Sequence, residues 1–419
     1  IDLQGKTLTP GFIDGHSHFM GFGRSQYASV APPPVGTVTN ISELVKEIQK
    51  YKEDKGMKDG EWINAFGYDQ DQLAEKRHPT KEDLDAAFPG NPVSVTNVNG
   101  HMTVANSYAL KISGIDASTP DPAGGKIVRK KGTQEPAGLL QEAAARLLKR
   151  GPGKVLTDSE KLQQLADQQL FYASNGITTA QDGMTSIESL QILEKAAAQK
   201  KLFIDIEALP GYRTLDQVIA NPAYKFGTLN NHLKLAGTKL VADGSPQGTT
   251  AYFTHPYLVP IAGCEGDDCR GFPNVTQEEF NSAIIKAFKN NIRPFVHCNG
   301  DATIDMYISA IEHADSELNV KSVDRRPVTI HSQFVRPDQL DEYKQLGIVA
   351  ALFSISAATD LETRYLPPDW FVYGAVVAGI GCGLAAHGLP GLRDAIVAQA
   401  TCFVLMTLGV LLAGIADSG

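Results

Sequence analysis

Positive charge is scarce in this chain of 419 residues, which has 38 Lys and Arg against 47 Asp and Glu and a formal charge of −9. No stretch gathers Lys and Arg into a basic stripe, and binding to phosphates requires such clusters. The sequence therefore predicts that nucleic acid is not a partner. A glycine-rich phosphate loop is also missing after the first apolar run, which disfavours a doubly wound nucleotide-binding sheet.

Cysteine is scarce as well, because five cysteines are too few for a disulfide scaffold. Cys264 and Cys269 share the loop "GCEGDDCRG" and form either a disulfide in an oxidising compartment or two thiols in a reducing one. The first residues, "IDLQGKTLTPG", contain neither an initiator Met nor a signal peptide, so we expect the chain to begin within a longer protein. The compartment, cytoplasmic or periplasmic, and the oligomeric state stay open.

The chain does have short apolar runs that alternate with amphipathic stretches, which is typical of a parallel α/β sheet. Hydrophobic residues make up 42% and charged residues 20%, as in a folded globular protein. Amphipathic helices are predicted over 158–176 and 276–291, and each stretch opens on a capping residue and ends at Asn or Gly. The predicted strands lie at 11–16, 178–183, 203–209, 233–243, 293–300, 328–334, 348–354 and, weakly, 378–386. Eight such strands predict a TIM (β/α)8 barrel.

A long insertion is predicted between the first two strands of the barrel. It covers residues 20–157, has strands of its own at 61–69 and 91–100, and should supply part of the pocket. We expect residues 1–354 to form the barrel domain with this insertion, and residues 355–419 to form an atypical apolar segment.

Metal-competent side chains lie at the ends of several predicted strands. His16 and His18 are two residues apart, so both imidazoles would lie on the same face of the first strand. His297 and His331 belong to later strands, and the carboxyl ends of barrel strands meet at one face of the molecule. Each histidine alone is an ordinary polar residue, but the four together predict a metal site.

Lys239 lies within an apolar strand and would lose hydration there, which favours the neutral amine. A neutral amine can take up carbon dioxide and become a carbamate that bridges two cations. The alternative is a lysine whose ammonium group reaches the rim of the barrel. The nearby histidines favour the bridging role.

Four motifs resemble the metal-dependent amidohydrolase superfamily. They are, in order, "PGFIDGHSHF", "TKLVADGSPQGTTA", "VHCNGDATID" and "IHSQFVRPDQL". The insertion, with "GYDQDQL" and "DPAGGKIVRKKGTQEPAGLLQEAA", is similar to the YtcJ-like or AepA-like branch, which includes N-substituted formamide deformylases. The resemblance covers about residues 1–354.

This resemblance implies a hydrolase of carbon–nitrogen bonds other than peptide bonds, with one or two divalent metal ions, usually zinc, and a small-molecule amide or N-acyl or N-formyl amine as substrate. It implies that His16 and His18 hold one metal, His297 and His331 the second, and carbamylated Lys239 bridges them. Lys239, His297 and His331 are therefore the expected catalytic residues. Substrate contacts are expected from the side chains of His101, Tyr68 and Tyr252, although His101 could equally be a hydrogen-bonded loop histidine. Asp243 and Asp301 are expected to orient the ligand histidines.

The resemblance fails after about residue 355. An aspartate should end the eighth strand, but "AGIGCGLAAHGLPG" has His387 near that place and no carboxylate. We therefore expect a distorted or incomplete C-terminal end of the barrel, and the flanking β-sandwich is largely missing. The alternative function is a catalytically silent amidohydrolase-like fragment that binds metal or ligand.

The last part of the chain contains a long apolar run. Residues 395–416 are 22 residues without a charge, which is long enough to span a bilayer. Three interpretations stay open for residues 371–416: a membrane-associated segment, a buried final strand and helix, or a tail from a shifted reading frame.

Overall fold

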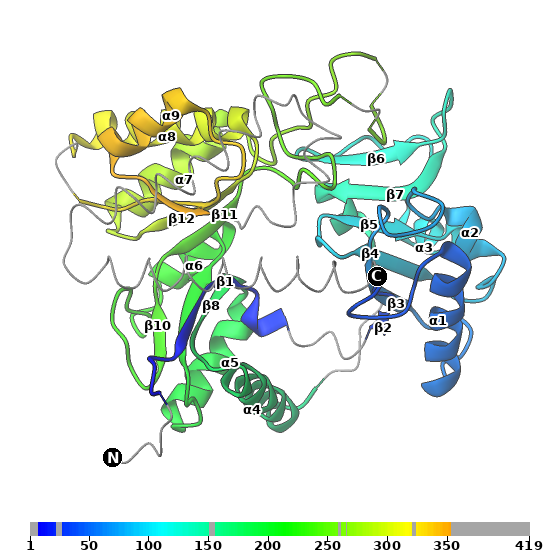
Figure 1. The fold of residues 1–419 in the computed structure, drawn as a ribbon, viewed down its shortest axis with the longest axis horizontal. Helices are drawn as coiled ribbons and strands as arrows, with labels where there is room; N and C mark the ends of the chain where they lie inside the picture. Colours follow the sequence, from blue (N-terminus) through cyan, green and yellow to red (C-terminus); the bar gives the residue numbers. More distant parts are fainter. Residues whose placement is uncertain are drawn as a thin grey trace.

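The computed structural model describes most of the chain up to residue 352. The described ranges are 7–21, 27–150, 156–258, 261–264, 266–320 and 324–352. Figure 1 shows three groups of strands, one of which (β2 to β7) lies apart from the two others. The predicted eighth strand at 378–386 and the apolar run at 371–416 lie outside these ranges.

The first sheet contains four parallel strands in the order β1-β8-β9-β10. Its strands are β1 (Phe12–Ser17), β8 (Ile177–Thr185), β9 (Asp205–Pro210) and β10 (Leu233–Leu235). Its helices are α4 (Asp158–Ser174), α5 (Ile187–Ala198), η3 (Tyr212–Thr214, a 3-10 turn) and α6 (Leu215–Ile219). Buried apolar side chains of α5, including Leu190 and Leu193, pack against Ile206 of β9. The strands predicted at 11–16, 178–183 and 203–209 are confirmed as β1, β8 and β9.

The second sheet also contains four parallel strands, in the order β11-β12-β13-β14. Its strands are β11 (Thr238–Val241), β12 (Pro294–Cys298), β13 (Val328–His331) and β14 (Val349–Leu352). Its helices are α7 (Gln277–Lys289), α8 (Asp301–Leu318) and α9 (Pro337–Leu346). Figure 1 shows these helices covering one face of the sheet, where Phe280 and Tyr307 stack with ring centroids 5.5 Å apart.

The two parallel sheets meet where one long strand, 233–243, was predicted. The structure divides it into β10 and β11, which pair with different sheets. Gly237 lies between them, and a Cβ there would approach the carbonyl oxygen of Arg293 to 2.3 Å. A residue without a side chain is therefore required where the chain crosses from one sheet to the other. A parallel bridge between Gly211 and Lys239 joins the end of β9 to β11.

No closed barrel is formed within the ranges that the structure describes. The parallel strands run from β1 through β8, β9 and the divided β10/β11 to β14, and β1 and β14 are the outer strands. Phe12 and Ile13 of β1 are correspondingly exposed, at 55% and 68%. The arrangement is that of a mixed α/β core with barrel-like strand order.

The insertion forms its own six-stranded mixed sheet, in the order β2-β3-β4-β5-β7-β6. Its strands are β2 (Ala28–Ser29), β3 (Ile63–Tyr68), β4 (Val93–Asn97), β5 (Met102–Ala105), β6 (Gly125–Arg129) and β7 (Pro136–Glu142). Its helices are α1 (Ile41–Asp54), α2 (Lys81–Asp85), α3 (Ser107–Ser113) and the 3-10 helix η2 (Ala143–Leu147). The two strands predicted at 61–69 and 91–100 correspond to β3 and β4.

Both predicted helices begin at a threonine cap. Thr157 and Thr276 each accept the backbone N–H of a glutamate three residues later, whose carboxylate accepts the threonine N–H in return. These reciprocal bonds satisfy N–H groups that have no partner within the helix. Helix α4 is followed by Asn175 and α7 by Asn290, close to the predicted ends.

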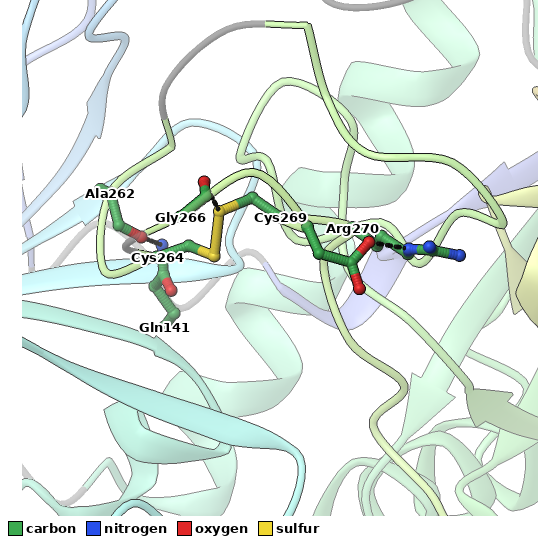
Figure 2. Close-up of a disulfide and its surroundings, with 7 residues drawn as sticks. Gln141, Ala262, Cys264, Gly266, Cys269 and Arg270 are labelled. Carbon is green, nitrogen blue, oxygen red and sulfur yellow. Dashed lines mark hydrogen bonds and ion pairs between the residues drawn. A yellow bond between two sulfur atoms is a disulfide. The ribbon is translucent and has the colours of Figure 1, made fainter.

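The loop that follows β11 carries a disulfide between Cys264 and Cys269 (Figure 2). Of the two interpretations left open by the sequence, the structure therefore has the bonded one. Gln141 of β7 donates a hydrogen bond to the carbonyl of Ala262, 3.4 Å away, and so ties this loop to the insertion sheet. Arg270 beside the disulfide pairs with Asp268.

None of the helices in the described ranges is long and apolar enough to cross a membrane. The membrane interpretation of residues 371–416 concerns a segment beyond these ranges and stays a prediction.

Candidate active site

Five histidines from four separate parts of the chain come together at the carboxyl ends of the parallel strands. His16 is the penultimate residue of β1, His297 belongs to β12 and His331 to β13. The ring of His331 lies 5.3 Å from that of His16 and 4.6 Å from that of His297, centroid to centroid. His18 lies 5.6 Å from His16, and His101 of the insertion lies 5.2 Å from His297. The structure thus brings together all four predicted histidine ligands and the predicted substrate contact His101.

Lys239 lies among these histidines. Its side chain is only 1% exposed, and its Nζ atom lies 3.2 Å from Nε2 of His16. Burial lowers the pKa of Lys239 to about 7, because the charged ammonium group loses its hydration. A substantial fraction of the side chain is therefore the neutral amine at neutral pH, as the bridging role requires.

Burial also keeps three of the imidazoles neutral. It lowers the pKa of His16 to about 3 and that of His331 to about 2, and nearby Lys239 lowers both further. The pKa of His297 is held well below its usual range by burial and by the neighbouring His331. Neutral imidazole is the form that has a free lone pair for a metal ion.

Hydrogen bonds orient two of the rings. Nδ1 of His16 lies 3.4 Å from Oε1 of Gln181, which is on the neighbouring strand β8. Nε2 of His297 lies 3.0 Å from the carbonyl oxygen of Gly244 and 2.9 Å from Nδ2 of Asn299. With its proton on Nε2, His297 donates to that carbonyl and keeps the Nδ1 lone pair for a ligand.

His331 ends its strand in an unusual backbone conformation. His331 has φ 70° and Ser332 has φ 45°, both in the left-handed region that residues with a side chain seldom adopt. The hydroxyl of Ser332 bonds to that of Tyr343 at 3.0 Å, which anchors this turn to α9. Strained backbone of this kind is concentrated at functional sites.

Asp243 is fully buried beside His297 and holds the loops around the site. Its carboxylate accepts the backbone N–H groups of Asn299, Gly300 and Tyr252, and its Oδ1 lies 3.6 Å from Nε2 of His297. Burial raises the pKa of Asp243 to about 7, although the N–H groups oppose this shift. The position of Asp243 agrees with its predicted role behind a ligand histidine.

Asp301 makes different contacts from those expected. Its carboxylate accepts hydrogen bonds from Thr254 and from the guanidinium of Arg336, the latter at 2.9 Å. Asp301 begins α8 and ties it to α9, so the interpretation that it orients a ligand histidine gives way to a structural role.

The two predicted substrate tyrosines are placed differently. Tyr68 is fully buried in the core of the insertion, and its hydroxyl lies 3.0 Å from Nδ1 of His78. Contrary to the prediction, Tyr68 therefore packs within the insertion instead of lining an open pocket. Tyr252 is half-buried in the loop after β11, and its backbone N–H donates to Asp243.

Glu142 is a site residue that the sequence reasoning did not single out. It ends β7, is 6% exposed at its side chain, and its Oε2 lies 3.0 Å from Nδ1 of His101. It also accepts hydrogen bonds from Thr250 and Asn274. Burial alone would lower the pKa of His101, but the carboxylate of Glu142 raises it above its usual value. The sequence feature that could have indicated Glu142 is its place at the end of the apolar run "PAGLLQE".

The donor set fits a divalent ion in its chemistry. It combines buried imidazoles that are held neutral with a lysine amine of lowered pKa. Among the residues that the structure describes, no three His, Cys, Asp or Glu side chains are arranged so that they could hold a metal ion together. Nε2 of His16 and Nε2 of His297 instead face protein atoms.

Residues 1–377 match the Amidohydrolase family, and the chain belongs to this family. The matched region continues past residue 354, where the motif resemblance ended. The resemblance to the YtcJ-like and AepA-like branch with its formamide deformylases is confirmed by curated relatives at 26–28% identity.

Three curated relatives illustrate the range of the family. Protein LONG AFTER FAR-RED 3 of Arabidopsis thaliana is 29% identical over 363 residues, which are 84% of this chain and 59% of the relative. N-substituted formamide deformylase of Arthrobacter pascens is 26% identical, covering 83% and 63%. Putative amidohydrolase YtcJ of Bacillus subtilis is 28% identical, covering 88% and 65%. The chain therefore spans less than two thirds of the length of each of these relatives.

A solved structure confirms the fold. An uncharacterized metal-dependent hydrolase from Pyrococcus horikoshii has a TM-score of 0.58 and 22% identity, covering 86% of this chain and 66% of its own. The chain thus has an amidohydrolase-family fold of mixed α/β content. Family and relatives support a hydrolase and do not favour the silent-fragment interpretation.

Proposed function

We propose that this chain hydrolyses carbon–nitrogen bonds in small, non-peptide amides, with N-formyl and N-acyl amines as the substrate class. The observation that carries the proposal is the meeting of four strand-end histidines with buried Lys239. Support also comes from a relative named N-substituted formamide deformylase and from a structural neighbour described as a metal-dependent hydrolase.

The residues that would hold the metal follow from their positions. His16 and His18 share one strand end and would bind one ion, while His297 and His331 on adjacent strands would bind a second. Zinc is the first candidate, because imidazole nitrogens suit it well. A divalent ion bound here would supply an activated water molecule and polarise the substrate carbonyl.

Lys239 would connect the two pairs of histidines. The neutral Nζ of Lys239 attacks carbon dioxide. An N–C bond forms as one C=O π bond breaks, and the nitrogen then loses a proton to solvent, which gives a carbamate with two oxygens. The lowered pKa of Lys239 supports this step, because only the neutral amine has the lone pair that attacks. Until then, His16 accepts a hydrogen bond from Nζ and keeps the amine in place.

The insertion would complete the site from the opposite side. His101 lies against His297 and is held through Nδ1 by Glu142, which leaves Nε2 available for the substrate carbonyl or leaving group. Tyr252, in the loop held by Asp243, remains the second proposed substrate contact.

A panel of aryl and alkyl N-formyl amines tests this proposal, with formate release as the readout. We expect turnover by the full chain, loss of turnover on chelation and recovery with zinc. His297→Ala should reduce kcat more than about 100-fold. Removing a group that only supports a metal ligand lowers activity about 10- to 100-fold, and removing the ligand itself should cost more. His313→Ala, which alters an exposed histidine of α8, is the matched control and should behave as wild type. Full activity of His297→Ala, or activity that survives chelation, would refute the proposal.

A further inference from the structure

A cavity of about 290 Å³ lies between the insertion and the ends of three parallel strands, and its lining includes chain neighbours of Lys239 and Glu142. Thr185 of β8, Gly211 after β9 and Val241 of β11 form one wall. The 3-10 helix η2 forms the opposite wall with Ala143 and Arg146. A space of this size accommodates a small substituent of a substrate rather than a whole drug-sized molecule.

The cavity adjoins the reactive lysine. Val241 lies two residues beyond Lys239, so both side chains are on the same face of β11. Gly211, which also lines the cavity, forms a backbone bridge with Lys239. On the insertion side, Ala143 directly follows Glu142, which binds His101. A substrate whose carbonyl lies at Lys239 and His101 therefore has the cavity within reach of its next few atoms.

The charge of the cavity is positive. Arg146 and Arg213 line it, and none of the described lining residues is acidic. Within the described part of the chain, neither arginine is in an ion pair. Arg213 is held by its neighbour Tyr212, whose hydroxyl accepts from Nε at 2.8 Å and whose ring centroid lies 5.4 Å from the guanidinium. Two guanidinium groups without acidic partners are suited to bind a carboxylate.

Two further features of the lining agree with a polar ligand. Ser186 caps the N-terminus of α5, a helix of 12 residues whose positive end therefore lies at the cavity. The buried Oδ1 of Asn274 has no hydrogen-bond partner among the described residues, while its Nδ2 donates to Glu142 at 3.2 Å. Buried acceptors without a partner are rare, so this oxygen is ready to accept an N–H from a ligand.

We infer that this cavity is a subsite for a carboxylate, and that the substrate is an acidic N-acyl or N-formyl amine such as an N-formyl amino acid. Arg146 and Arg213 bind the carboxylate, and Oδ1 of Asn274 accepts the N–H of the amide. The inference rests on the proposed function, since it names the substrate class of the same site.

Two probes that differ in one charge test the subsite. N-formyl-leucine carries the carboxylate, and N-formyl-leucinamide replaces it with a neutral amide of similar size. We expect wild type to prefer the acid in kcat/KM. Arg146→Gln and Arg213→Gln should each reduce the ratio of the two kcat/KM values about tenfold, the size of one charge-assisted hydrogen bond. Arg326→Gln removes an exposed arginine of another region and should leave the ratio unchanged.

Calorimetric titration with N-formyl-leucine separates this inference from the proposed function. Binding that is weakened in the double variant Arg146→Gln/Arg213→Gln, but without turnover of either probe or of any N-formyl amine of the panel, would support the subsite and refute the hydrolase. Turnover of both probes with equal kcat/KM in wild type and double variant would refute the subsite and leave the hydrolase standing. No binding of N-formyl-leucine, together with no turnover of the probes or of the N-formyl amine panel, would refute both.

Discussion

Single residues in this site have protonation states set mainly by burial. Lys239 is the clearest case, because the pKa of a lysine in water, 10.5, falls to about 7 in the folded chain. Between these two values the folded chain binds fewer protons than the unfolded chain. The free energy of unfolding contributed by this group therefore rises with pH across that interval and is lowest below pH 7.

In the metal-free protein, Lys239→Met removes the free-energy cost of burying a lysine that is charged in the unfolded chain. We expect the free energy of unfolding at pH 7 to increase by about 1–4 kcal/mol, as happens when buried charges are replaced by apolar side chains. The gain should shrink as the pH rises toward 10.5, because the lysine of the unfolded chain then also begins to lose its proton and the two states bind more nearly equal numbers of protons. Urea unfolding between pH 7 and 10 measures it, with exposed Lys289→Met as control. A gain that does not depend on pH would contradict the shifted pKa of Lys239.

Glu142→Gln tests the charge that supports His101. The raised pKa of His101 depends mainly on this carboxylate, so in the variant burial is opposed by the charge of Asp243 alone and the pKa of His101 should fall. In wild type, the protonated His101–Glu142 pair stabilises the fold below pH 6.5, and this contribution is lost as the pH rises through the raised pKa. Histidine NMR titration of the metal-free chain measures the shift. Glu135→Gln, which changes an exposed carboxylate before β7, is the control, and an unchanged His101 pKa in Glu142→Gln would contradict the account.

At the scale of elements, the close pairing of β1 and β8 positions the first two histidines. Gly183 lies on β8 next to His16, and a Cβ at Gly183 would approach Cε1 of His16 to 2.8 Å. The strand needs a residue without a side chain at this point for the imidazole to lie against it.

Gly183→Ala should therefore displace the His16 ring while the sheet is retained. We expect metal affinity to fall by about 10-fold or more, the loss typical of a ligand that is no longer held in place. Gly15→Ala is the matched control, because a Cβ at Gly15 would meet no atom within 4 Å. Zinc titration with a competing chelator measures both variants, and equal affinities would show that this contact does not position His16.

The sequence predicted the parallel strands and their order well, because each has a short apolar run and capped helices separate several of them. It did not predict the division of 233–243 into β10 and β11. That break depends on the approach of Arg293 to Gly237, and Arg293 is far away in the chain. Glu142 and the burial of Tyr68 were missed for the same reason, since both depend on how the insertion packs.

At the scale of the whole molecule, two parallel sheets and an insertion sheet contribute to one site. The parallel sheets supply His16, His297, His331 and Lys239, and the insertion supplies His101 and Glu142. The four histidines could be predicted from the sequence because the carboxyl ends of parallel strands meet at one face. Of the insertion residues, His101 was expected from the resemblance, but Glu142 was not, because no comparable rule says where the ends of the insertion strands lie.

The metal content of the purified full chain, measured by mass spectrometry after equilibration with zinc, tests the central claim most directly. The account predicts about two zinc ions per chain in wild type and in His313→Ala, and a clear loss in His297→Ala and Lys239→Met. About one zinc ion per wild-type chain would mean that a metal centre is present but that Lys239 does not bridge two ions. Essentially no bound zinc in wild type would contradict the claim that these histidines form a metal site.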